Sequence, residues 1–208
     1  HPWKLSLLER SISHVKLNGY EVGDPWGKEA SKIEANANVL SVFPEISELV
    51  DAEIKNVFKS NHVVKLSIAK ACLLCAEKSS LKQPSVFIIL DSGKTVIVET
   101  FGPDSYSVGT VDCGTDEIIK SAVEVFGSGN KETALSYLRL AKEDLLSEDI
   151  ASSVKKAIAE KMVDWQFLVK NKITAFSGTR APESLVLVYR KGFKDFFYHF
   201  IKDQLPVR

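Results

Sequence analysis

The stretch VFIILDSGKTVIV, residues 86–98, decides the fold, because two apolar runs flank the short polar sequence Asp91-Ser92-Gly93. Both runs are rich in β-branched residues, and a glycine occupies a position where a short turn needs a left-handed backbone. This pattern predicts a β-hairpin. Residues 105–112 suit a further antiparallel strand, so the hairpin and third strand span residues 85–112. We therefore expect an antiparallel sheet of three to five strands in the middle of the chain.

Helical periodicity precedes this block of strands. In residues 3–17 and 28–42, apolar side chains recur at spacings of three and four, as in a helix that buries one face. Further helices are expected to begin at Pro44 and near residue 63, because proline suits the first turn of a helix and the later run is apolar on most faces. The sequence therefore predicts a helical region over residues 1–80.

Helices are expected again after the sheet, over residues 115–170, and a strand and a last helix over residues 184–204. Strands that come in one block between helical blocks are typical of an α+β fold, whereas a parallel α/β fold alternates the two elements. No connection is much longer than about ten residues, which gives no persuasive linker between domains. Residues 1–208 are therefore expected to form a single α+β domain.

The composition excludes several classes of protein. The chain has 208 residues, of which 45% are hydrophobic, and its 27 basic and 27 acidic residues give a formal net charge of zero. Neutrality argues against a wholly basic nucleic-acid binder and a polybasic membrane-surface protein. No apolar run approaches the roughly 20 residues that a membrane-spanning helix needs. We expect no membrane span and a location in the cytoplasm, with the nucleus as the alternative.

The three cysteines, Cys72, Cys75 and Cys113, are too few for a disulfide framework. Cys72 and Cys75 have the C-x-x-C spacing of redox pairs and of half a zinc site, but they fall within an apolar stretch. A tetrahedral zinc site would need two more ligands, and neither Cys113 nor His62 shows paired ligand spacing. We expect these cysteines to be core residues, and we expect no metal and no cofactor.

The remaining motifs give weak chemical signals. The sequence GSGNK at residues 127–131 matches no phosphate-binding pattern and is typical of a turn between helices. Five acidic residues near the expected sheet could bind Mg²⁺, but acidic residues are common at turns and caps. They are Asp91, Glu99, Asp104, Asp112 and Asp116. No histidine lies in a catalytic signature, so we expect a protein that is not an enzyme, with a metal- or thiol-dependent enzyme as the least favoured alternative.

The C-terminal segment, residues 165–208, differs in composition from the rest. It carries eight basic and three acidic residues, so its charge is +5 and that of residues 1–164 is −5. It also holds nine of the nineteen aromatic residues. A group of exposed aromatic side chains usually marks a site that meets a partner.

Two functional hypotheses follow from this segment. The leading one is a non-enzymatic protein–protein interaction or assembly module, which associates with itself or another protein through aromatic side chains. Its expected interface residues are Trp165, Phe193, Phe196 and Phe200. The alternative is an RNA- or DNA-binding protein, because single strands bind surfaces that combine cations with aromatic rings. Its expected binding residues are Lys170, Lys172, Arg180, Arg190, Lys191 and Lys194.

Overall fold

The computed structural model describes residues 5–59, 64–102, 105–125, 145–177 and 181–189, together with residues 127, 132, 133, 136 and 140. The chain divides into two compact units, and the division falls inside two of its strands. Unit 1 comprises residues 1–83 and 100–107, and unit 2 comprises residues 84–99 and 108–208. The described elements are both helices and strands, which confirms the α+β fold class.

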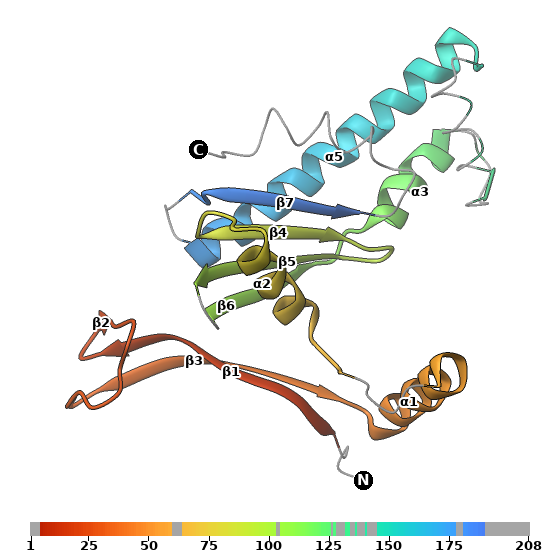
Figure 1. Cartoon of the computed structure of the whole chain (residues 1–208). Coiled ribbons are helices and arrows are strands. Elements are labelled where there is room, and N and C mark those ends of the chain that lie inside the picture. The colour runs from red at the N-terminus through yellow and green to blue at the C-terminus, as the bar shows by residue number, and fades with distance from the viewer. Residues whose placement is uncertain are drawn as a thin grey trace. The chain divides into compact units, whose positions relative to one another are not determined.

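The expected hairpin and third strand are present and belong to one sheet. They form β4 (Ser85–Leu90), β5 (Thr95–Gly102) and β6 (Ser105–Val111), and β7 (Ser184–Tyr189) joins them in the order β6-β5-β4-β7. β7 pairs in parallel with β4, so this sheet is mixed, not purely antiparallel as expected. The last strand returns beside the first strand of the block because a long helix carries the chain back along the sheet (Figure 1).

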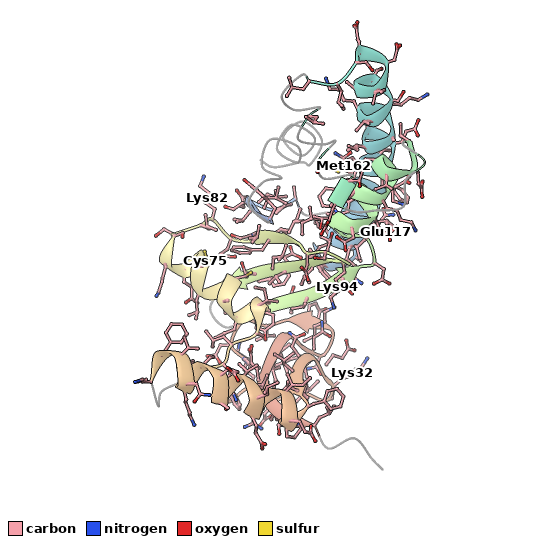
Figure 2. All side chains as sticks on the ribbon, turned by 90° about the vertical axis from the view of Figure 1, so that its right-hand side faces the viewer. Lys32, Cys75, Lys82, Lys94, Glu117 and Met162 are labelled. Atoms are coloured by element: carbon pink, nitrogen blue, oxygen red, sulfur yellow. The ribbon has the colours of Figure 1, made fainter. Side chains whose placement is uncertain are left out.

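Two helices cover one face of this sheet in unit 2: α3 (Thr115–Val125) and α5 (Glu148–Ser177). The side of α5 that meets the sheet carries apolar residues at spacings of three and four, as burial of one helix face requires. They are Val154, Ile158, Met162, Trp165, Val169 and Ile173. Figure 2 labels Met162 within this packed layer. The same cluster includes Val86, Ile88 and Ile97 of the sheet, so unit 2 has a continuous core.

Trp165 is the largest fully buried side chain among the described residues, and its indole N–H has a specific partner. Nε1 donates to Oγ1 of Thr95 on β5 at 2.8 Å, and this hydroxyl donates to the carbonyl oxygen of Cys113 at 2.7 Å. Thr95 is itself fully buried. The pair of hydrogen bonds therefore ties α5 to β5 and to the segment that follows β6, and it leaves neither buried donor unsatisfied.

The hairpin turn closes over the start of α3. The N–H groups of Thr115 and Asp116 donate to the carbonyl oxygens of Asp91 and Ser92, at 2.9 and 2.8 Å. Gly114 makes this approach possible, because a Cβ atom there would lie 2.3 Å from the Ser92 oxygen. Two of the N–H groups that a helix N-terminus leaves without intrahelical partners are thus satisfied by main-chain carbonyls.

The expected helices over residues 3–17 and 28–42 are wrong. Unit 1 instead contains a three-stranded sheet in the order β2-β1-β3, formed by β1 (Ser6–Leu17), β2 (Tyr20–Glu21) and β3 (Ile33–Val42). Asn18 and Gly19 both have positive φ, at 52° and 87°, so they form a tight hairpin turn between β1 and β2. Asn18 also accepts hydrogen bonds from the N–H groups of Ser31 and Lys32, which fixes the entry into β3.

The other two helices expected before the sheet are confirmed, with a later start for the second. α1 (Pro44–Phe58) has its proline in the first turn, and α2 (Ile68–Lys78) begins after Ser67, whose hydroxyl accepts from the N–H of Lys70. Buried residues of α2 include Cys72 and Leu73, whereas α1 has no buried residue. The helix expected over residues 192–204 lies outside the described residues.

Candidate protein-binding surface

Unit 1 exposes an unusual amount of apolar side chain. Among the described residues, seventeen of the twenty-five exposed large apolar side chains lie between residues 5 and 68. We define the unit 1 apolar surface as those that project from one face of the β1–β3 sheet and from α1. Its members are Leu7, Ile12, Ile33 and Val39 of the sheet, with Ile46, Leu49, Val50, Val57 and Phe58 of α1.

The sheet part of this surface follows from the register of β1 and β3. Arg10 pairs with Val39 and Ile12 pairs with Ala37, so Val39 and Ile12 share one face as diagonal neighbours. Both are about two-thirds exposed, at 65% and 66%. This face of the sheet is therefore apolar and accessible.

The helical part of the surface lies on α1. Ile46, Leu49 and Val50 follow the spacing of a single helix face, and Leu49 is 63% exposed. A neighbouring side of the helix is engaged, because Ser47 and Asp51 accept from Nζ of Lys65, with 2.7 Å to the Asp51 carboxylate. This ion pair fixes the segment before α2 against α1 and leaves the apolar side uncovered.

A pocket of about 330 Å³ opens beside β1 in the same unit. Three apolar and three cationic side chains line it, with one acidic side chain. They are Leu8, Ile12 and Leu66, then Arg10, Lys65 and Lys70, and Glu9. The pocket thus combines apolar walls with positive charge.

Glu9 is held in place on one side of this pocket. Its carboxylate accepts from the N–H of Ser67 at 3.1 Å and from the hydroxyl of Tyr106. Burial alone would raise the pKa of Glu9, but the hydrogen bonds from Ser67 and Tyr106 and the charge of Lys70 outweigh it and lower that pKa. Glu9 is therefore ionised at neutral pH, and its charge is offset within the unit.

The structure places Trp165 in the core of unit 2, which corrects its expected place at an exposed interface. Helical spacing with Met162 and Val169 points its ring at the sheet, so it offers no surface to a partner. The other three expected interface residues, Phe193, Phe196 and Phe200, lie outside the described residues, and their role stays a prediction.

Only two of the six expected nucleic-acid contacts are described. Lys170 is exposed on α5, and Nζ of Lys172 lies 5.7 Å from the ring centre of Phe176. Arg180, Arg190, Lys191 and Lys194 lie outside the described residues. Because four of the six residues lie outside the described part of the chain, the proposed nucleic-acid contacts stay a prediction.

The acidic residues near the sheet form no metal site in the part of the chain that the structure describes. No three histidine, cysteine, aspartate or glutamate side chains come together there as ligands. The main-chain carbonyl of Asp91 accepts from the N–H of Thr115 at the start of α3. Asp104 lies outside the described residues, as does all of the GSGNK sequence except Gly127.

The cysteines differ in burial, and this predicts their reactivity. Cys75 on α2 (Figure 2) is exposed, which corrects its expected place in the core, whereas Cys72 and Cys113 are buried as expected. Burial and the neighbouring Cys75 raise the pKa of Cys72 from 9.0 to about 11, and burial raises the pKa of Cys113. Two pH units correspond to roughly 100-fold less thiolate, which is the reactive form.

In native buffer at mildly alkaline pH we therefore expect one thiol to react with a disulfide reagent well before the other two. Peptide mapping of the labelled protein should identify Cys75, and Cys75→Ser should remove the fast phase. Unfolding in urea should make all remaining thiols equivalent. Labelling of Cys72 first would contradict the burial of its sulfur.

Comparison with known proteins identifies a shared fold but no family. No known protein family matches the sequence, and no curated protein matches it. Among solved structures, a chain of the PilM-PilN type IV pilus biogenesis complex is similar over 97% of this chain and 55% of its own, with a TM-score of 0.56 and 12% identity. This chain therefore spans about half the length of that neighbour. At this identity the likeness shows the fold alone.

Two further solved structures are more distant. The ethanolamine utilization protein EutJ from Carboxydothermus hydrogenoformans is similar over 65% of this chain and 48% of its own, with a TM-score of 0.44 and 12% identity. An archaeal actin homologue is similar over 69% of this chain and 49% of its own, with a TM-score of 0.35 and 14% identity.

Within the described ranges, no helix is both long and apolar enough to cross a membrane.

Proposed function

We propose that this chain is a protein-binding module of a larger assembly, and that it binds its partner through the unit 1 apolar surface. The observation that carries the proposal is α1, a helix of 15 residues with an apolar face and no buried residue. Burial of an apolar face is what normally stabilises a helix of this length in a protein. Groups of exposed large apolar side chains often mark sites of association.

The shared fold supports the same function. The solved neighbour with a TM-score of 0.56 belongs to a complex of two proteins that takes part in pilus biogenesis. A chain with that fold is suited to a role in assembly.

A more specific hypothesis is that the partner is a second copy of this chain, bound through Phe193, Phe196 and Phe200. Sedimentation velocity at increasing concentration separates it from binding to a different protein. A mass that rises with concentration and falls to that of a monomer in Phe196→Ser would support self-association.

The test of the proposed function is affinity capture from the native host with two matched double variants. Val39→Lys/Leu49→Lys places charge on both parts of the unit 1 apolar surface. Val163→Lys/Leu168→Lys makes the same change at two exposed apolar residues of α5 in unit 2. We expect a captured protein, identified by mass spectrometry and then purified, to bind the wild type and the α5 variant equally.

Binding to the Val39→Lys/Leu49→Lys variant should be at least about tenfold weaker, because a charge at a desolvated contact costs more than a single order of magnitude in affinity. Circular dichroism checks that both variants fold. The proposal is overturned if no protein is captured, or if the partner binds both variants as tightly as it binds the wild type.

A further inference from the structure

The pocket beside β1 has a feature that the unit 1 apolar surface does not explain. Lys65 is already paired with Asp51, and the charge of Glu9 is offset by Lys70. The described residues supply no hydrogen-bond or ion-pair partner to the guanidinium of Arg10, which is exposed on the pocket wall. Within the described residues, this positive charge with its forked set of donors therefore has no protein partner.

The β1 strand also has an open edge beside this pocket. β2 pairs only with Lys16 and Leu17, and the next carbonyl, that of Val15, accepts from the N–H of Val22. Residues 6–14 of β1 therefore have a strand partner on the β3 side alone, within the described part of the sheet. The N–H and C=O groups of such an edge can pair with an added extended chain.

The residues that line the pocket place it along that edge. They come from β1 and from residues 65–70. None of the described residues that line the pocket belongs to β3. The wall opposite β1 is held in place, because the N–H of Ser67 donates to Glu9 and Nζ of Lys65 binds Asp51. The result is a slot between an open strand and a fixed segment, with apolar side chains from Leu8, Ile12 and Leu66 beside Arg10.

We propose that this slot binds an extended acidic segment of a partner protein. The segment adds a strand to the edge of β1, a side-chain carboxylate of Asp or Glu binds the guanidinium of Arg10, and neighbouring apolar side chains pack against Leu8, Ile12 and Leu66. The inference rests on the proposed function and names the chemistry of the partner. Positive charge and apolar walls in one slot favour a segment in which acidic and apolar residues alternate.

The test uses a short, end-blocked, fluorescent peptide in which valine alternates with glutamate. A second peptide carries glutamine in place of glutamate, and a third is this glutamine peptide with a free C-terminal carboxylate. A fourth is the glutamate peptide with alternate amides N-methylated, which cannot complete the strand ladder. Anisotropy measures the binding of each peptide to the wild type, to Arg10→Glu and to Lys28→Glu, a matched change at an exposed lysine outside the pocket.

We expect the glutamate peptide to bind the wild type and Lys28→Glu with the same affinity. The glutamate peptide should bind Arg10→Glu at least about tenfold more weakly than it binds the wild type. The glutamine peptide and the N-methylated peptide should bind the wild type at least about tenfold more weakly than the glutamate peptide does. The proposal is overturned if the glutamate and glutamine peptides bind equally, or if Arg10→Glu binds the glutamate peptide as tightly as the wild type does. It is also overturned if the peptide with the free C-terminal carboxylate binds more tightly than the glutamate peptide. The absence of binding to the wild type would overturn it as well. In each of these cases the capture experiment with Val39→Lys/Leu49→Lys still decides the proposed function by itself.

Discussion

Replacing Trp165 with alanine is expected to lower the free energy of unfolding of unit 2 by about 3–5 kcal/mol. The indole is fully buried between α5 and the sheet, so truncation leaves a large cavity in the core. It also removes the N–H donor that binds Oγ1 of Thr95, itself a buried group. Loss of a buried partner adds to the cost of the cavity.

Urea denaturation followed by far-UV circular dichroism measures this change, because α5 is the longest helix described. Phe167→Ala is the matched control, since Phe167 lies two residues further along α5 and is 64% exposed. Its effect should stay within about 0.5 kcal/mol, as for most surface substitutions. Similar losses in the two variants would contradict the burial of Trp165.

The second large effect is expected at Gly114. A methyl group there would lie 2.3–2.5 Å from the carbonyl oxygens of Ser92 and Asp91 and the N of Lys94, all main-chain atoms that cannot rotate aside. Gly114→Ala should therefore push the hairpin turn away from α3 and destabilise unit 2 by about 3 kcal/mol. The hydrogen bonds from Thr115 and Asp116 to the turn should weaken with it.

Thermal unfolding of Gly114→Ala beside Gly93→Ala tests this packing. Gly93 lies in the same turn, but it does not have the left-handed backbone expected from the sequence, and a Cβ atom added to it meets nothing within 4 Å. Gly93→Ala should leave the unfolding temperature nearly unchanged, and amide exchange at Thr115 and Asp116 should accelerate only in Gly114→Ala. Equal changes in unfolding temperature for the two variants would contradict the close packing of the turn against the start of α3.

The parts of the fold that sequence patterns predict are those whose pattern fits one kind of element. Residues 86–98 form two β-branched apolar runs around a short glycine turn, and the stretches that became α1, α3 and α5 repeat with helical spacing. Residues 6–17 are different, because their apolar positions fit both periods. The Asn18-Gly19 turn decides in favour of strands, and this dipeptide is a stronger hairpin signal than a helix stop.

Long-range pairing and the candidate site were beyond the reach of local patterns. β4 and β7 pair although about a hundred residues separate them, and nothing in their sequences sets a parallel direction. Trp165 belongs to an apolar stripe that only the full length of α5 makes evident. The pocket joins Arg10 to Lys65 and Lys70 across more than fifty residues without a motif. The sequence does not reveal the unit 1 apolar surface, because residue type alone does not distinguish an exposed apolar side chain from a buried one.

Hydrogen–deuterium exchange of this chain, with and without its captured and purified partner, tests the central claim most directly. The account predicts that partner binding slows exchange within residues 6–58, which contain β1, β3 and α1, and leaves α5 unchanged. Protection confined to residues 148–177, with none in residues 6–58, would contradict the assignment of the binding surface to unit 1.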